Sequence, residues 1–275
     1  MSIHPPHPIP TRKLGVRLAG SGMAVPDKRL TNDDLARLVD TNDEWITQRT
    51  GIKERRVLAE GRTVRHLAAD AMRAALHSAG LEPGQLDLVI CSTLTPQMIC
   101  PTTAAQVVAD LGAVPAGAMD LNAACSGFVY ALNLAAALIE TGRYRTIGVI
   151  GAEALSTITD YKDRRLCILF GDGAGAAVLT SSDDPQQGCL DQTMASDGSM
   201  WAELYCPRTP ADLPPNDKVF SGAYNTLQMN GQAIYKFAVS TLQRTIDDVL
   251  ARNQLQATDL KVIIPHQYNR RILES

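Results

Sequence analysis

The stretch that decides the fold runs over residues 64–93, VRHLAADAMRAALHSAGLEPGQLDLVICST. Its first part spaces apolar residues along one face of a helix, and Gly80 is placed to end that helix. A short polar turn follows. LDLVICST is then a continuous apolar run, as expected for a strand that is covered on both faces. The stretch therefore predicts a helix that packs on a buried sheet.

Segments on both sides continue this alternation. GVRLAGSGMAVP (15–26) indicates a strand that leads into a turn, and TNDDLARLVD (31–40) indicates a helix with Thr31 as its N-cap. AGAMDLNAA (116–124) and YRTIGVIGAE (144–153) indicate two more buried strands, separated by a long apolar helix. This order predicts an α/β fold with a largely parallel sheet.

A second copy of the helix-and-strand pattern lies near the C-terminus. IYKFAVSTLQRTIDDVLARNQLQATDLKVIIPHQ (234–267) aligns with the first stretch so that Leu255 lies opposite Leu81, and His266 opposite Ser92. The alignment predicts a further strand that leads to His266. The first copy continues through two more strands after Ser92, whereas nine residues follow His266. We therefore expect a flexible tail over residues 1–13, an N-terminal half over 14–182, and a truncated C-terminal half over 183–275 that lacks roughly 60–80 residues.

The composition argues against several classes of protein. The chain has 275 residues, of which 45% are hydrophobic and 20% charged, and its net charge of −3 gives no sign of nucleic-acid binding. It holds no apolar run of ~18 residues, so we expect no membrane span. Six cysteines are scattered without C-x-x-C spacing, and they show no metal-ligand spacing with the five histidines. We therefore predict a cytoplasmic protein with free thiols and no bound metal.

Two stretches carry candidate catalytic residues. In NAACSGF (122–128), Cys125 lies at the joint of a strand and a helix, where the positive end of the helix dipole favours a nucleophilic thiolate of lowered pKa. The alternative is a cysteine that fills the core. In VIIPHQYN (262–269), His266 follows an apolar strand at the end where α/β sheets bind ligands, and it can act there as a base or a hydrogen-bond donor. The alternative is a structural or merely exposed histidine.

Two further stretches bear on nucleotide recognition. In DEWITQRTGIKERR (43–56), Trp45 and Arg49 lie on one face of a predicted helix and offer a platform for an adenine ring and phosphates. The alternative is a solvated basic turn in which Trp45 is a packing anchor. LFGDGAGAAVLT (169–180) contains a G-x-G-x-G run. The β-like residues on both sides favour a strand, a tight turn and a strand over a dinucleotide-binding loop.

Four motifs in this order resemble the β-ketoacyl-acyl-carrier-protein synthase III family of thiolase-fold enzymes. They are TNDEWITQRTGI (41–52), DLNAACSGFVYAL (120–132), DRRLCILFGDGAGAAVL (163–179) and IPHQYN (264–269). The resemblance extends from about Gly15 to the last residue. It implies an α/β thiolase-like fold, a duplicated and layered αβαβα sandwich whose second repeat is incomplete in this chain. It also implies a homodimer.

The resemblance implies an acyltransferase that condenses an acyl-coenzyme A primer with malonyl-acyl-carrier protein. The products are 3-oxoacyl-carrier protein, CO2 and coenzyme A, and the reaction initiates fatty acid or polyketide synthesis. Acyl-coenzyme A is a substrate, and no cofactor is implied. Cys125 matches the acyl-accepting nucleophile, and His266 matches the histidine that polarises the thioester carbonyl of the malonyl group. The implied binding residues are Trp45, Arg49, Thr41 and Arg164 for coenzyme A, Cys100 for the acyl pocket, and Lys236 and Arg271 for docking of the carrier protein.

The chain also departs from the family pattern. The family's third catalytic residue, an asparagine well beyond the histidine, has no counterpart, since Asn269 matches the last position of the family's H-Q-A-N. Tyr268 replaces the alanine of that motif. The family's C-terminal glycine-rich loop also lacks a counterpart, and we expect poor condensation because one lost oxyanion donor costs on the order of 10²–10³ in rate. Cys100 replaces a phenylalanine and leaves room for a longer or branched primer.

Two alternatives use the same residues differently. The first keeps Cys125 as nucleophile but passes the acyl group to an oxygen or nitrogen nucleophile. The second is a truncated, inactive homologue or fragment that acts at most as a dimerising partner.

Overall fold

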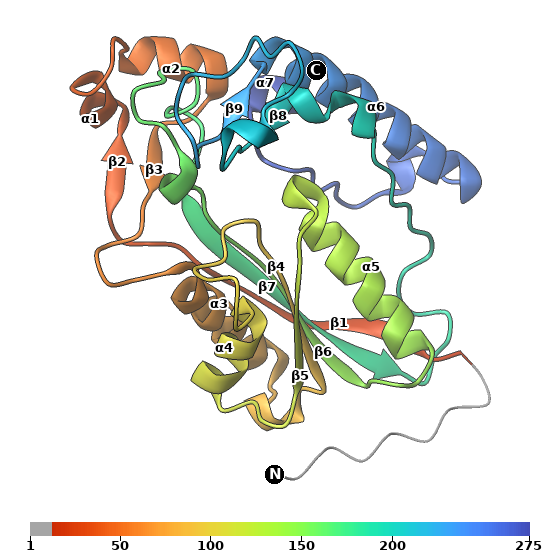
Figure 1. Ribbon diagram of the computed structural model, residues 1–275. Coiled ribbons are helices and arrows are strands. Elements are labelled where there is room, and N and C mark those ends of the chain that lie inside the picture. The colour runs from red at the N-terminus through yellow and green to blue at the C-terminus, as the bar shows by residue number, and fades with distance from the viewer. Residues whose placement is uncertain (1–12) are drawn as a thin grey trace. The chain divides into compact units, whose positions relative to one another are not determined.

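The computed structural model describes residues 13–275, which form two compact units (Figure 1). Unit 1 comprises residues 13–28, Leu58–Ala154 and Asp172–Leu190. Unit 2 comprises Arg29–Val57, Leu155–Gly171 and Asp191–Ser275. Residues 1–12 of the predicted tail lie outside the described part of the chain. The predicted division into halves at residue 182 stays a prediction.

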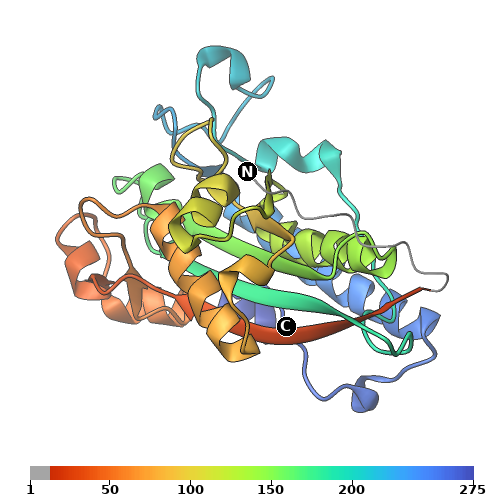
Figure 2. The ribbon, with the colours of Figure 1, turned by 90° about the horizontal axis from the view of Figure 1, so that it is seen from below.

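Unit 1 is built on a five-stranded sheet in the order β1-β7-β6-β4-β5. The strands are β1 Gly15–Ala24, β4 Leu88–Ser92, β5 Gly117–Leu121, β6 Thr146–Ala154 and β7 Asp172–Ser182. β4 runs parallel to β5 and β6, whereas β7 is antiparallel to both β6 and β1. Figure 2 shows β1 in red with β7 in teal beside it. The α/β class is confirmed, but the sheet is mixed and not largely parallel, because β7 runs antiparallel between β6 and β1.

Helices cover both faces of this sheet (Figure 1). α3 (Val64–Ala79) and α4 (Thr103–Leu111) pack on one face, and α5 (Gly127–Glu140) packs on the other. β4 alternates between the two cores: Val89 and Cys91 belong to the core under α3, and Leu88 and Ile90 to the core under α5. This confirms the prediction of a strand covered on both faces.

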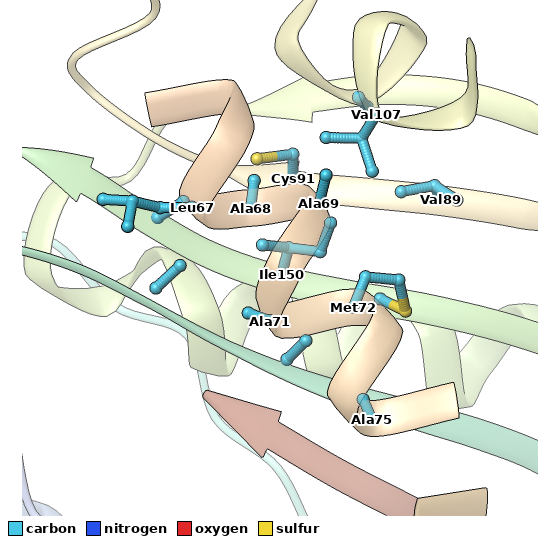
Figure 3. Packing of buried hydrophobic residues seen from close by; sticks show 14 of the residues in the cluster. Leu67, Ala68, Ala69, Ala71, Met72, Ala75, Val89, Cys91, Val107 and Ile150 are labelled. Atoms are coloured by element: carbon cyan, nitrogen blue, oxygen red, sulfur yellow. The ribbon is translucent and has the colours of Figure 1, made fainter. Parts of the chain in front are cut away.

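Small residues let α3 lie close to the sheet. Figure 3 shows Ala68, Ala69, Ala71 and Ala75 of this helix in the core, with larger side chains of β4, β6 and α4 around them. A Cβ atom on Gly22 of β1 would lie 2.3 Å from the backbone nitrogen of Ala75. Glycine is therefore required at the point where α3 crosses β1.

Two sequence predictions are wrong at the level of local structure. β5 is not buried: its residues are half-buried or exposed, and Met119 is 39% exposed, because β5 is an edge strand of the sheet. CILF (167–170) forms turns and not a strand. In the following G-x-G-x-G run, Gly173 and Gly175 lie inside β7, and Gly171 directly precedes it. Since they do not open a helix, the rejection of a dinucleotide-binding loop is confirmed.

Unit 2 contains two pairs of short antiparallel strands and four α-helices. β2 (Arg29–Thr31) pairs antiparallel with β3 (Glu54–Arg56), and β8 (Leu204–Tyr205) pairs antiparallel with β9 (Gln228–Met229). The α-helices are α1 Asn32–Ala36, α2 Asp43–Thr50, α6 Gly231–Arg252 and α7 Arg270–Leu273. Thr31 caps α1 through its hydroxyl, as the sequence predicts. The 3-10 helices of the chain are Pro83–Gln85, Ala124–Ser126, Leu155–Ile158, Gly198–Glu203, Pro210–Asp212 and Ala257–Asp259.

The predicted repeat is correct up to the strand. A residue of left-handed conformation follows each helix, Gly80 with φ 66° directly after α3 and Gln254 with φ 56° two residues after α6. In both copies the next leucine N–H donates to a carbonyl five residues back, Leu81 to Leu76 at 3.0 Å and Leu255 to Leu250 at 2.9 Å. A 3-10 helix then follows at matching positions, Pro83–Gln85 and Ala257–Asp259.

The two copies differ after that turn. The first continues as β4 between two neighbouring strands, whereas residues 262–266 form no strand. Val262 and Ile264 are 69% and 83% exposed. The strand predicted up to His266 is therefore wrong for this structure, since a strand exists only when a neighbouring strand takes up its backbone hydrogen bonds.

Candidate active site

Cys125 lies on the turn that joins β5 to α5 in unit 1. β5 ends at Leu121, the 3-10 helix Ala124–Ser126 follows, and α5 begins at Gly127. Ala124 has a φ of 46°, a left-handed conformation that costs free energy for a residue with a side chain. Its N–H donates to the side-chain oxygen of Asn122 at 3.3 Å, which supports this turn. Cys125 is exposed, so it does not fill the core, and the predicted position at a strand–helix joint is confirmed.

The end of β4 lies directly beneath this turn. A Cβ atom on Gly127 would lie 1.9 Å from the Oγ of Ser92, the last residue of β4. The N–H of Thr93 donates to the carbonyl of Leu121 at 3.1 Å. The turn that carries Cys125 is therefore positioned by the neighbouring strand as well as by its own sequence.

The pKa of the Cys125 thiol is raised, and the expected lowering by the helix dipole is wrong. The protein that surrounds the sulfur desolvates it and so disfavours the thiolate. The carboxylate of Glu153 raises the pKa further. A raised pKa favours the protonated thiol of Cys125 at neutral pH.

Glu153, near the end of β6, is a residue that the sequence analysis missed. Its carboxylate accepts hydrogen bonds from the Leu94 N–H at 2.9 Å and from the Thr95 hydroxyl at 2.6 Å, with a longer contact of 3.5 Å from the Thr93 hydroxyl. Burial raises the pKa of this carboxyl. An acidic residue at the end of the apolar run YRTIGVIGAE was the available signal.

Cys100 lies on the exposed loop between β4 and α4. Its neighbours Met98 and Ile99 are 41% and 87% exposed. The loop ends where Asp120 of β5 accepts hydrogen bonds from the N–H groups of Thr103 and Ala104 at 2.7 and 2.8 Å and so caps α4. The role of Cys100 in an acyl pocket stays a prediction.

Unit 2 brings the predicted coenzyme A residues together around Trp45 of α2. The guanidinium carbons of Arg49 and Arg164 lie 4.7 and 5.2 Å from the centre of the Trp45 ring. Arg164 also donates to the backbone carbonyl of Asp40 at 2.9 Å. The hydroxyl of the next residue, Thr41, is buried and lacks a protein hydrogen-bond partner. An indole face, two guanidinium groups and a free hydroxyl are suited to an adenine nucleotide.

The Trp45 ring is at the same time a packing residue. It is partly buried against the core of Leu35, Ile46, Cys167 and Ile168. Arg55 of β3 lies in the interior and donates to the carbonyl of Ile168 and to the side chain of Asn32. Burial lowers the pKa of Arg55 to about 10, which leaves it charged. This buried cation connects the segment that carries Arg164 to the strand that follows α2.

His266 lies in unit 2 on the irregular segment before α7, and it keeps exposed surface. Partial desolvation of the imidazole lowers the pKa of His266 and keeps the ring neutral. The ring of Tyr268 is stacked with it, at 6.4 Å between centroids and 11° between planes. Tyr268 also donates through its hydroxyl to the sulfur of Met229 at 3.2 Å, which anchors it in a core of unit 2. The catalytic role predicted for His266 stays a prediction.

The two predicted docking residues are exposed side chains of unit 2. Lys236 lies in the first turns of α6, and Arg271 lies in α7, which packs against α6. Asn269 caps α7 by accepting from the N–H of Arg271 at 2.9 Å. Their part in recognising a carrier protein stays a prediction.

None of the helices in residues 13–275 has the length and apolar character needed to cross a membrane. In the same part of the chain, histidine, cysteine and acidic side chains form no group able to hold a metal ion.

Comparison with protein-family models gives one match. Residues 119–198 match the model of 3-oxoacyl-[acyl-carrier-protein (ACP)] synthase III. This part contains the last three residues of β5, Cys125, α5, β6 and β7.

Curated proteins similar to this chain include two named β-ketoacyl-[acyl-carrier-protein] synthase III. The protein from Caldanaerobacter subterraneus subsp. tengcongensis is 44% identical over 263 residues, which cover 96% of this chain and 79% of the relative. The protein from Xylella fastidiosa strain 9a5c is 44% identical over 265 residues, with 96% and 80% covered. These matches cover nearly all of this chain, and they do not support the expected C-terminal truncation.

Solved structures show the same fold. The 3-oxoacyl-[acyl-carrier-protein] synthase III of Aquifex aeolicus VF5 matches with a TM-score of 0.86 and 41% identity, covering 94% of this chain and 79% of that chain. The priming β-ketosynthase of the R1128 polyketide biosynthetic pathway matches with a TM-score of 0.86 and 33% identity, covering 98% and 79%. The thiolase-like fold predicted from the motifs is confirmed by these matches.

Proposed function

Since the chain belongs to the 3-oxoacyl-[acyl-carrier-protein] synthase III family of acyltransferases, we propose that it condenses an acyl-coenzyme A primer with malonyl-acyl-carrier protein and so starts a fatty acid or polyketide chain. The observation that carries the proposal is the exposed Cys125 on a supported turn between β5 and α5. The proposed reaction uses acyl-coenzyme A as a substrate and needs no prosthetic group.

In the first step, the Cys125 sulfur attacks the thioester carbonyl of acyl-coenzyme A. A carbon–sulfur bond forms at Cys125, the bond to coenzyme A breaks, and coenzyme A leaves as a thiol with the proton. The raised pKa of Cys125 supports a thiol that gives up its proton during this exchange. Trp45 and Arg164 would hold the adenine, with Arg49 and Thr41 at its margin, and the ring and guanidinium contacts of Trp45 support this assignment.

In the second step, malonyl-carrier protein loses CO2, and the resulting carbanion attacks the acyl-Cys125 carbonyl. The carbon–sulfur bond to Cys125 then breaks, the 3-oxoacyl-carrier protein is released, and the Cys125 thiolate takes up a proton from solvent. His266 would donate a hydrogen bond to the developing enolate oxygen, a role that a neutral imidazole can fill. Lys236 and Arg271 would attract the acidic carrier protein, and their exposure supports this.

The working form is proposed to be a homodimer in the cytoplasm. The edge position of β5 and the exposed Met119 support pairing of this edge with a second copy. Cys100, on the exposed loop after β4, would then shape the acyl pocket, and its small side chain supports a primer longer or more branched than acetyl. The six cysteines form no disulfide within residues 13–275, and this supports a reducing compartment. In analytical ultracentrifugation, we expect a species of about twice the 29.6 kDa chain mass, and a species at the chain mass would contradict the homodimer.

Acyl loading tests the proposed function. The protein is incubated with acetyl-, isobutyryl- or octanoyl-coenzyme A, and the adduct is located by peptide mass spectrometry. We expect an acyl group on Cys125 in the wild type and none in the matched Cys125→Ala variant. A strict preference for acetyl would overturn the primer proposal, and the absence of any adduct would overturn acyl transfer altogether.

Addition of malonyl-carrier protein tests the second step. We expect loss of the Cys125 adduct together with release of CO2 and formation of 3-oxoacyl-carrier protein. Loss of the adduct to an alcohol or amine acceptor in the absence of malonyl-carrier protein would show acyl transfer to oxygen or nitrogen instead.

A further inference from the structure

We propose that Glu153 is a positioning residue for Cys125: through the segment that follows β4, it fixes the turn from which the nucleophile projects. The proposal deepens the proposed function and rests on it only in calling Cys125 the nucleophile. It concerns a half-buried carboxyl group that the proposed steps do not use.

The strand register places Glu153 at the same end of the strands as residues 122–126, the turn that carries Cys125, here called the nucleophile turn. Ser92 of β4 is paired with Leu121 of β5 on one side and with Gly151 of β6 on the other. Glu153 is therefore two residues beyond Gly151 in β6, and the turn that carries Cys125 begins directly after Leu121 in β5. The segment 93–95 that follows β4 lies between them.

Hydrogen bonds connect the two sides through this segment. Glu153 accepts from the Leu94 N–H at 2.9 Å and from the Thr95 hydroxyl at 2.6 Å. Thr95 closes the arrangement by accepting from the N–H of Ala154 at 2.8 Å. On the other side, the Thr93 N–H donates to Leu121 at 3.1 Å, where the nucleophile turn begins. Removal of the carboxylate would free this segment and, through Thr93, the end of β5.

The charge of Glu153 gives it a second effect. Glu153 acts electrostatically on the thiols of Cys125 and the buried Cys91, and Asp120 is the other acidic group that acts on Cys91. The Asp120 carboxylate is directed to the N-terminus of α4. The residues that approach the nucleophile turn from β4 and α5, Ser92 and Gly127, carry no charge. A thiolate beside a carboxylate is disfavoured, so Glu153 keeps the resting sulfur protonated and slow to react with alkylating or oxidising agents.

The test separates charge from position with three variants. Glu153→Gln keeps the side-chain shape and removes the charge, whereas Glu153→Asp keeps the charge and shortens the reach. Thr95→Val removes one donor to the carboxylate and leaves the charge in place. The pH dependence of Cys125 alkylation by iodoacetamide is measured by peptide mass spectrometry, and acyl loading from acyl-coenzyme A is measured separately.

We expect Glu153→Gln to lower the midpoint of the alkylation profile, because the carboxylate that disfavours the thiolate is removed. Glu153→Asp and Thr95→Val should keep the wild-type midpoint but load the acyl group more slowly. A wild-type midpoint in Glu153→Gln would overturn the charge effect, and wild-type loading rates in both other variants would overturn the positioning effect. If Glu153→Gln does not fold, wild-type loading rates in Glu153→Asp and Thr95→Val would still overturn the positioning effect. If the wild type loads no acyl group, the proposed function is overturned. The alkylation rate of the fully deprotonated thiol in these two variants then tests the positioning effect, and wild-type rates would overturn it.

Discussion

The first residue of α5 has no room for a side chain. A Cβ atom on Gly127 would lie 1.9 Å from Ser92 Oγ, so Gly127→Ala must displace either the strand end or the helix start. We expect a loss of about 1–3 kcal/mol in the free energy of unfolding, as for other overpacked sites, and slower acyl loading of Cys125. Urea denaturation and intact-mass loading assays measure the two effects.

A second substitution identifies the cause of that loss. Ser92→Ala removes the oxygen that the new methyl group would meet, although the Ser92 Cβ would still be 3.2 Å away. The double variant should therefore recover part of the stability lost in Gly127→Ala. Equal loss in the single and double variants would show that helix propensity, and not the contact with Ser92, determines the effect.

The two tryptophans offer a matched comparison for the coenzyme A site. Trp45 is stacked with Arg49 and Arg164, whereas Trp201 in the same unit is 51% exposed and has Tyr205 as its aromatic neighbour. Trp45→Ala should raise KM for acyl-coenzyme A by roughly five- to thirtyfold, the equivalent of about 1–2 kcal/mol. Trp201→Ala is the control. A similar rise in KM for both variants, measured by steady-state kinetics, would argue against an adenine site on Trp45.

The position or contact of a single residue was predictable from the sequence where neighbouring residues in the chain determine it. The cap at Thr31 and the position of Cys125 at a strand–helix joint follow from local patterns. The protonation of Cys125 does not, because Glu153 reaches it from another strand. The contact of Arg164 with Trp45 likewise joins distant parts of the chain, and it was expected from the family resemblance alone.

At the scale of elements, the end of α3 is a sensitive position. Gly80 has a φ of 66°, and its N–H bonds to the last turn of the helix. Gly80→Ala should lower the free energy of unfolding by about 1 kcal/mol, because an alanine is strained in this conformation. Gly84, in the turn that follows, is the control. An added Cβ there meets nothing within 4 Å, so Gly84→Ala should stay within about 0.5 kcal/mol of the wild type. Equal effects in urea denaturation would contradict this explanation.

Elements were predictable when their own periodicity defines them. α3, α6 and the turns that end them follow from the repeat, down to matching hydrogen bonds at Leu81 and Leu255. The strand expected up to His266 and the burial expected for β5 were wrong. Both depend on neighbours: a strand needs a partner, and its burial depends on its place in the sheet order, which periodicity does not encode.

At the scale of the whole molecule, His266 makes stability depend on pH. Desolvation lowers its pKa in the folded state, so the unfolded chain binds more protons as the pH falls through about 6.5. Stability from this group is therefore complete above that pH and is lost below it. His266→Gln removes this dependence. The difference in unfolding free energy, variant minus wild type, should increase from pH 7.5 to pH 5.5, with the value at pH 7.5 as the baseline. A constant difference in urea denaturation would contradict the lowered pKa.

The overall topology was only partly predictable. The α/β class follows from alternating segments, but the place of β7 between β6 and β1 comes from pairing between distant residues such as Val16 and Ser181. No local pattern specifies that order. The thiolase-like architecture was therefore expected from the motifs around Trp45, Cys125 and His266, and not from periodicity.

The exposed run Val262–Ile263–Ile264 has a consequence for how the protein behaves in concentrated solution. These three adjacent β-branched side chains are 69%, 49% and 83% exposed. A short exposed segment of high β-propensity can pair with the same segment of another molecule and so promote aggregation. Lys261 and Pro265 flank this segment. The charge of Lys261 and the missing backbone N–H of Pro265 both oppose the addition of further chains to an aggregate. Colloidal stability should accordingly depend more on these two flanking residues than on the net charge of the chain.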